Sequence, residues 1–335
     1  MIVPHLRFDE TVSGWVIFSP SRSRRPHSYS TPEPDPATAE HNHCPFCPGN
    51  ENLTPPEIYA ERPDGGDWQV RVIPNKFPAL RIEEDDRRIM DGFGNQWMGG
   101  CGAHEVIIES PRHSALLANQ PLEQVERVLR TAQLRYNDLM RDHRFQTVIV
   151  FKNHGVAAGT SLEHPHWQLI ATPVVPRLLR LKHFEAAEYF DRTGRCLYCV
   201  IVERELDAQE RIVATNKDFV ALCPYAAHVP FETWILPRSH QSSFGQAEPY
   251  RLASLAALLK DVLQRLTVEL DNPDYNLSID TAPRGDEEKS YFLWHLRVLP
   301  RLSEPAGFEM GSGMSINTVL PEESAKCLRE VALPG

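Results

Sequence analysis

The chain has no long hydrophobic run, because charged residues interrupt its apolar stretches well before the ~20 residues that cross a bilayer. Its amino-terminal residues, Met1 to His5, lack the basic-then-apolar pattern of a secretory signal. Basic side chains are in the minority, with 35 Lys and Arg against 45 Asp and Glu, and the formal net charge is −10. This balance argues against binding to nucleic acid by bulk electrostatics. We therefore expect a cytoplasmic protein with no membrane and no nucleic-acid partner.

Cysteine is scarce, and the way it is distributed is informative. Four of the seven cysteines form two Cys-x-x-Cys pairs, Cys44/Cys47 and Cys196/Cys199. In a cytosolic chain such pairs indicate metal ligands or thiols rather than disulfides.

The 335 residues repeat one order of features, which predicts two fused halves. Each half has a Cys pair, an apolar segment, a strand ending in a basic turn with histidine, an amphipathic helix and two more strands. The helices are expected from Pro121 to Leu139 and from Pro249 to Leu266, since apolar residues recur there at helical spacing. The fold class is therefore α+β, with an antiparallel sheet and a packing helix in each half, and the two sheets could pair. We place the halves at 1–178 and 190–335, joined by a connector from 173 to about 190.

The segment His164-Pro165-His166-Trp167-Gln168 carries most of the chemical information. Side chains alternate along a strand, so His164, His166 and Gln168 would share one face. The small-residue loop at 153–161 lies just upstream and could bring backbone N–H groups and a hydroxyl close to an anion. The combination suggests phosphoryl chemistry, although paired histidines are also typical of metal sites and of buried core pairs.

The repeat nominates the ligands of two metal sites. Cys44 and Cys47 have the chelating spacing of zinc ligands, and His113 and His164 complete a closed, structural Cys2His2 site. A pair of buried thiols is the alternative. In the second half, Cys196, Cys199 and His240 occupy the equivalent positions. The position equivalent to His164 is Leu293, so His295, on the same strand face, is the best candidate for the fourth ligand.

Three motifs in this order resemble the galactose-1-phosphate uridylyltransferase family, the transferase branch of the histidine-triad superfamily. They are Cys-Pro-Phe-Cys at 44–47, Ser-Pro-Arg-His at 110–113 and Gly-Thr-Ser-x-x-His-Pro-His-Trp-Gln at 159–168. The resemblance extends from Ser19 to Glu309. It implies two histidine-triad-like halves, bound zinc, nucleotide sugar and sugar phosphate substrates, and a homodimer.

The resemblance also implies a role for individual residues. His166 would attack the α-phosphorus of a nucleotide sugar and form a covalent nucleotidyl-histidine, which predicts ping-pong kinetics. Gln168 would donate to a non-bridging oxygen, with Ser161 beside it. The further substrate contacts are Asn153, Gly159, Thr160 and Ser161 for the phosphates, Asn75 and Phe77 for the base, Arg22 and Arg25 for phosphate across a dimer interface, and Glu309 for sugar hydroxyls.

The chain departs from the well-known bacterial uridylyltransferases at their second metal site, which is built from a glutamate and three histidines. The matching residues here are Lys182, Asp280, His295 and Arg297, so we expect that site to be absent. The second Cys pair and the glycine-rich segment 307–317 look more like the plant ADP-glucose phosphorylase branch.

Several interpretations of function remain open. UDP-glucose with galactose 1-phosphate is the first substrate choice, and ADP-glucose with phosphate is the second. A zinc-stapled nucleic-acid-binding or interaction protein is the alternative from another class. Hydrolysis is less favoured than transfer, because Gln168 stands where histidine-triad hydrolases usually have a third histidine.

Overall fold

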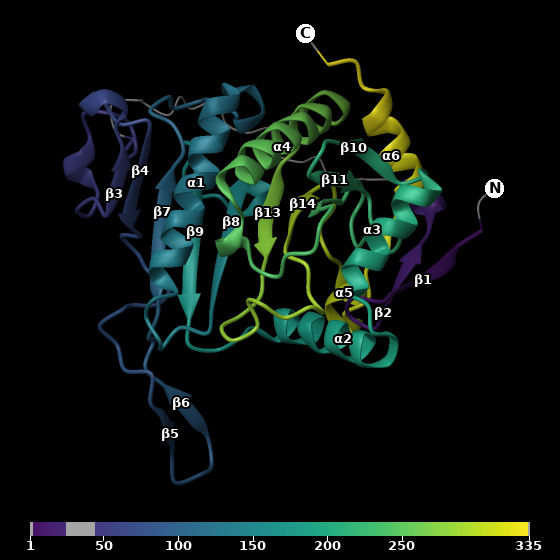
Figure 1. Ribbon diagram of the computed structural model, residues 1–335, viewed down its shortest axis with the longest axis horizontal. Helices are drawn as coiled ribbons and strands as arrows, with labels where there is room; N and C mark the ends of the chain where they lie inside the picture. Colours follow the sequence, from purple (N-terminus) through teal and green to yellow (C-terminus); the bar gives the residue numbers. More distant parts are fainter. Residues whose placement is uncertain (1–2, 25–43, 334–335) are drawn as a thin grey trace.

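A single sheet of ten antiparallel strands runs through the molecule (Figure 1). The computed structural model describes residues 3–24 and 44–333. The strand order is β10-β11-β12-β14-β13-β8-β9-β7-β4-β3, and every neighbouring pair is antiparallel. Five strands come from each repeat, and the two sets meet where β8 pairs with β13. The expected pairing of the two sheets is thus present, and the α+β prediction is confirmed.

The regular elements have the following bounds. The strands of the large sheet are β3 (Tyr59–Glu61), β4 (Val70–Pro74), β7 (Ala103–Ile108), β8 (Thr147–His154), β9 (His166–Thr172), β10 (Ile212–Thr215), β11 (Phe219–Leu222), β12 (Thr233–Pro237), β13 (Tyr275–Asp280) and β14 (His295–Pro300). The smaller strands are β1 (His5–Asp9), β2 (Gly14–Phe18), β5 (Arg88–Met90), β6 (Gln96–Met98) and β15 (Ile316–Asn317). The helices are α1 (Leu122–Leu139), α2 (Arg177–Thr193), α3 (Leu197–Ala208), α4 (Pro249–Glu269), α5 (Gly307–Ser312) and α6 (Pro321–Glu330).

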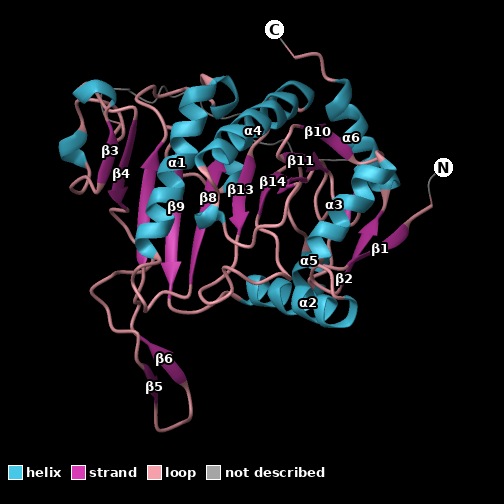
Figure 2. Ribbon diagram, in the orientation of Figure 1, coloured by secondary structure: helices cyan, strands magenta, loops and turns pink. Residues whose placement is uncertain are grey.

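Helices α1 and α4 lie together on one face of the sheet (Figure 2). Both were expected from their apolar stripes, and both begin at or directly after the expected proline. Residues such as Val125, Leu129, Leu255 and Leu259 are buried against the strands in one large core. Most side chains on this helix-covered face belong to the apolar core, so we look for the functional side chains on the opposite face or at the strand ends.

The observed elements differ from the sequence expectation in three places. The connector after β9 contains a helix, α2, which ends at Gly194 in the left-handed conformation that favours glycine. Strand β9 begins at His166 rather than His164, because Pro165 has no N–H to donate to a ladder. Strand β14 likewise begins at His295 rather than near residue 291.

Two small sheets lie outside the main one. Strands β1, β2 and β15 form a three-stranded sheet, and β5 with β6 forms a hairpin that projects from the body (Figure 1). No helix in the described part of the chain is both long enough and apolar enough to cross a membrane.

Candidate active site and metal centres

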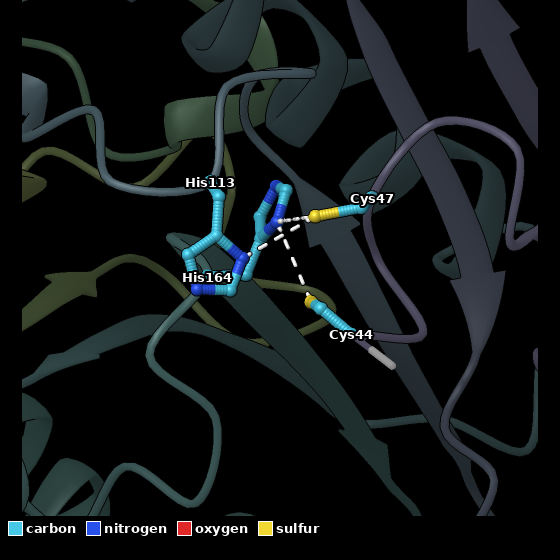
Figure 3. A group of neighbouring side chains, drawn as sticks. All are labelled: Cys44, Cys47, His113 and His164. Carbon is cyan, nitrogen blue, oxygen red and sulfur yellow. Dashed lines mark hydrogen bonds between the residues drawn. The ribbon is translucent and has the colours of Figure 1, made fainter. Parts of the chain in front are cut away.

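Cys44, Cys47, His113 and His164 form one group, although they come from three separate segments of the chain (Figure 3). Their ligand atoms all lie within 4.8 Å of one another. Cys47 Sγ is 3.3 Å from His113 Nδ1 and 3.6 Å from His164 Nδ1, and Cys44 Sγ is 3.7 Å from His164 Nδ1. The structure therefore brings together all four residues that the sequence nominated for the first metal site.

This donor set fits a zinc ion. Burial and the neighbouring Cys44 raise the pKa of the Cys47 thiol to about 11, so two adjacent thiols need a cation before both can ionise. The Nε2–H of His164 donates to the carbonyl of Ser110 at 2.8 Å, which leaves Nδ1 with a lone pair facing the sulfurs. Two sulfurs and two imidazole nitrogens are a usual tetrahedral zinc set.

A second group contains Cys196, Cys199 and His240. Cys199 Sγ lies 3.4 Å from His240 Nδ1, and the Nε2 of the same ring lies 3.2 Å from the carbonyl oxygen of Lys289. A hydrogen bond from Cys199 and the nearby His240 lower the pKa of Cys196. Two thiols and an oriented imidazole can hold a metal ion.

His295 does not join this second group, so the fourth ligand expected from the sequence is wrong. The His295 ring is fully buried and packs against the rings of Tyr198 and Trp234. Its Nδ1–H donates to the carbonyl of Leu293 at 3.0 Å, and Nε2 lies 3.5 Å from Asp280 Oδ2. Leu293 precedes β14, which begins at His295, so the two residues do not share a strand face, and the His295 ring is not among the ligand group.

A buried ion-pair network surrounds Asp280 instead. The Nζ of Lys182 donates to Asp280, and Arg297 Nη1 lies 3.7 Å from the same carboxylate. Burial alone would raise the pKa of Asp280, but Lys182 and Arg297 hold it well below its usual value. With two cationic side chains among the four residues, this set does not fit a bound metal ion.

His166 lies at the start of β9 on the face opposite α1 and α4, and its side chain is almost fully buried. Its Nδ1–H donates to the carbonyl of His164 at 2.8 Å, which leaves the Nε2 lone pair available. Burial lowers the pKa of His166 to about 4, so the ring is neutral near pH 7. The Phe46 ring contacts it edge-on with centroids 5.4 Å apart. A neutral, oriented imidazole of this kind is suited to act as a nucleophile.

A cleft of about 440 Å³ opens in front of His166. Four other residues that were predicted from the sequence also line the cleft: Asn75, Phe77, Ser161 and Gln168. The apolar part of the lining includes Phe46, Leu53, Ile73 and Val106. The cleft thus combines an apolar surface with polar groups near the nucleophile, as small-molecule sites usually do.

His104 was missed by the sequence analysis, although it orients Gln168. Its Nδ1 accepts the N–H of Ala79 at 3.2 Å, so its Nε2 carries the proton. That nitrogen donates to Gln168 Oε1 at 2.8 Å and lies 3.1 Å from Asn75 Nδ2. With its oxygen engaged, Gln168 presents its NH2 group as a donor to an anion. A single histidine in a strand gives no sequence signal for this role.

The loop after β8 is held by residues of the second half. Asn276 donates to Asn153 Oδ1 and to the carbonyl of Ala158, both at 2.9 Å. The NH2 group of Asn153 therefore remains a donor. Gly155 has a φ of 84°, and a Cβ there would collide with the Asp274 carboxylate. Gly159 and Thr160 continue this loop, and the Thr160 hydroxyl donates to the carbonyl of Leu162.

Two other predicted substrate residues, Arg22 and Glu309, do not line the cleft. Glu309 lies on α5, at a distance from β9 (Figure 1), and its carboxylate accepts the backbone N–H groups of Ala306 and Ile316. Arg22 follows β2, which pairs with β15, and is exposed. Arg25 lies outside the described residues.

Comparison with known proteins places this site in a family. The model of the galactose-1-phosphate uridyl transferase N-terminal domain matches residues 1–176, and that of the C-terminal domain matches residues 181–332. The chain therefore belongs to the galactose-1-phosphate uridylyltransferase family, and it is a nucleotidyltransferase. This finding confirms the resemblance seen in the motifs and rejects the alternative of a non-enzymatic interaction protein.

The similar proteins carry two different names. An ADP-glucose phosphorylase of Arabidopsis thaliana is 35% identical, over 98% of this chain and 93% of that protein. A galactose-1-phosphate uridylyltransferase of Thermotoga maritima is 28% identical, over 97% of this chain and 98% of that one. A crystal structure of an Arabidopsis thaliana ADP-glucose phosphorylase with bound ADP-glucose superposes with a TM-score of 0.86, over 99% of this chain and all of that one.

Proposed function

We propose that the protein transfers a nucleotidyl group from a nucleoside diphosphate sugar through a covalent intermediate on His166. The observation that carries this proposal is the presentation of a neutral, oriented His166 to a cleft whose other polar groups are hydrogen-bond donors. Such donors stabilise the charge that develops on a phosphoryl group in the transition state.

Each half of the proposed reaction exchanges one bond at the α-phosphorus. In the first half, Nε2 of His166 forms a bond to phosphorus, and the bond to the bridging oxygen breaks as the sugar phosphate leaves. In the second half, a phosphate oxygen of the acceptor attacks the same phosphorus and the imidazole departs as a neutral ring. The NH2 groups of Gln168 and Asn153 would donate to the non-bridging oxygens, while the loop with Gly159, Thr160 and Ser161 holds the adjacent phosphate.

Two nucleoside diphosphate sugars are candidates for the donor of the nucleotidyl group. ADP-glucose, with phosphate as acceptor, is supported by the higher identity to the Arabidopsis phosphorylase and by its high structural similarity. UDP-glucose, with galactose 1-phosphate as acceptor, is supported by the family models and by the Thermotoga relative. Asn75 and Phe77, which line the cleft with His166, are the proposed contacts of the base.

We propose zinc for both metal centres, with the Cys44 centre purely structural. When bound, zinc would cross-link the segment at 44–47 to His164, which lies just before β9. Side chains of this chain, rather than the metal, would carry the chemistry. All seven cysteines lie outside disulfides, which suits a reducing compartment, and we propose the cytoplasm.

We further propose a homodimer in which Arg22, Arg25 and Glu309 of one copy complete the cleft of the other. The distance between α5 and β9 within a single chain supports this arrangement (Figure 1). The projecting β5–β6 hairpin also needs a docking partner, since isolated two-stranded hairpins are marginally stable. It exposes Phe93 by 94% and Trp97 by 56%. Light scattering should therefore report a dimer, and Phe93→Ser with Trp97→Ser should weaken it.

Initial-rate kinetics test the proposed function. Varying donor and acceptor together should give the parallel double-reciprocal lines of a ping-pong reaction. Each donor is tested with both phosphate and galactose 1-phosphate. Intersecting lines, or turnover only with both substrates bound, would reject the covalent route.

A further inference from the structure

A lysine, a glutamate and a tryptophan meet directly behind the cleft. The Nζ of Lys152 lies 2.9 Å from Glu109 Oε2, and the Nε1–H of Trp167 donates to the same oxygen at 2.7 Å. The side chains of Lys152 and Glu109 are 1% and 0% exposed, and Trp167 is fully buried. We name Glu109, Lys152 and Trp167 the buried clamp.

The buried clamp lies on the helix-covered face of the sheet. Trp167 belongs to the core that α1 and α4 cover, as does Val150, two residues before Lys152. His166 directly precedes Trp167 and points to the opposite face, where the cleft lies, because side chains alternate along a strand. Asn153 directly follows Lys152, so its side chain also points to the face with the cleft. The clamp and the proposed reacting groups are therefore consecutive residues on opposite faces of the same strands.

The clamp stands where the backbone ladder between β8 and β9 has stopped. These strands pair from Thr147↔Thr172 to Phe151↔Gln168 and no further. Strand β8 continues to His154, but its last residues pair only with β13. On the other side, the N–H of Glu109 still bonds to the carbonyl of Pro165 at 3.2 Å. The side chains of Lys152, Glu109 and Trp167 thus connect the end of β8 to the end of β7 and the start of β9.

An ion pair in this position is not explained by stability. Removing two charges from water is costly, and well-packed apolar residues of similar volume are often as stable or more so. The ion pair and the indole hydrogen bond do, however, fix the relative positions of three strand ends. Fixed geometry is what a phosphoryl transfer between two strands requires, since catalysis depends on the alignment of the reacting atoms.

We propose that the buried clamp is a positioning device that sets the gap between His166 on β9 and Asn153 on β8. The α-phosphoryl group would pass through this gap, so the inference rests on the proposed function of His166. Glu109, Lys152 and Trp167 touch no substrate. They act through the backbone of the residues beside them.

The test uses the full-length protein and the double variant Lys152→Met/Glu109→Gln. Methionine approximates the length of lysine without its charge, and glutamine keeps an acceptor for Trp167. We expect full metal content, a melting temperature close to wild type, an unchanged KM for the donor, and a kcat lowered about 10- to 100-fold, the order expected for a small misplacement. Hydrogen exchange at the amides of 152–154 should accelerate.

A matched control removes a buried ion pair far from the cleft. Arg211 and Glu205 form such a pair between the segment before β10 and α3, with side chains 12% and 5% exposed. The variant Arg211→Met/Glu205→Gln should keep the wild-type kcat and the wild-type exchange at 152–154. The comparison separates positioning from a general effect of lost charge.

The results for the clamp variant, for Trp167→Phe and for wild type decide whether the clamp positions His166. A folded clamp variant with wild-type kcat and wild-type exchange would overturn the proposal. If that variant does not fold, Trp167→Phe removes one arm of the clamp and keeps the ion pair, and an unchanged kcat there would overturn the proposal equally. If wild type forms no nucleotidyl adduct, the proposed function fails, and the exchange measurement still decides whether the clamp holds the strands.

Discussion

The Nδ1 of His166 lies 2.8 Å from the carbonyl oxygen of His164. The side chain of His164 belongs to the group with Cys44 and Cys47, while its backbone orients the proposed nucleophile. Metal binding and nucleophile geometry are therefore linked through one residue. A substitution at Cys44 or Cys47 should therefore alter the orientation of the His166 ring, although neither cysteine is bonded to it.

The first prediction concerns Cys44→Ser. This variant should lose about one equivalent of zinc and unfold at a lower temperature, because a structural metal contributes its binding free energy to folding. Nucleotidyl transfer should fall with it. Metal analysis and thermal denaturation measure the first two effects, with Cys327→Ser, at a half-buried cysteine outside both groups, as the control. Unchanged zinc in Cys44→Ser would reject the first site.

The second prediction separates His295 from His240. The variant His295→Ala should retain the metal content of the wild-type protein. It should lose about 2–4 kcal/mol of unfolding free energy, in line with other large-to-small changes in cores. His240→Ala should instead lose the second metal equivalent. Metal content and urea denaturation of both variants check this pair, and loss of metal from His295→Ala would restore that residue as a ligand.

The third prediction concerns His104. His104→Ala frees the oxygen of Gln168, so the amide can turn and no longer present its NH2 group to the phosphoryl oxygens. We expect kcat to fall about tenfold or more, approaching the loss of a transition-state donor, with metal content unchanged. His104→Gln, which can still donate to Gln168, should retain more activity. Equal rates for wild type and His104→Ala would remove His104 from the site.

The fourth prediction is a pH dependence of stability. Burial lowers the pKa of His183 and of His295 to about 4, against 6.5 when unfolded. Between these values the unfolded chain binds more protons, so stability is full above pH 6.5 and is lost as the pH falls toward 4. Each histidine can account for roughly 3 kcal/mol, at about 1.4 kcal/mol per pKa unit.

Urea midpoints at pH 7 and pH 5 measure this effect. His183 stacks on Phe292 with centroids 3.8 Å apart, so His183→Phe can keep the packing and remove the titration. The stability lost between pH 7 and pH 5 should be smaller in His183→Phe than in wild type. An equal loss in the two proteins would contradict the assignment.

The sequence predicts well whatever depends on local spacing and on the repeat. The ligand spacing of Cys44 and Cys47 is local, and the repeat supplied His113 and His164, so all four meet in the structure. The amphipathic stripes of α1 and α4 are likewise properties of single segments.

The errors come from contacts between segments. The prediction for His295 assumed a strand that includes Leu293, but β14 begins at His295, and contacts with Tyr198, Trp234 and Asp280 decide where its ring lies. His104 and the pair of Glu109 with Lys152 gave no motif, because their partners are 25 or more residues away in sequence. Glu309, on α5, lies away from β9 within the chain (Figure 1), which no pattern in a single sequence reveals.

Mass spectrometry of the intact protein tests the central claim most directly. The protein is incubated separately with ADP-glucose and UDP-glucose, without acceptor, beside His166→Ala as control. We predict that wild type gains the mass of one nucleotidyl group from one of these donors, that digestion locates it on His166, and that His166→Ala stays unlabelled with its metal content intact. A folded wild-type protein that gains no mass from either donor, or a label that persists in His166→Ala, would contradict the account.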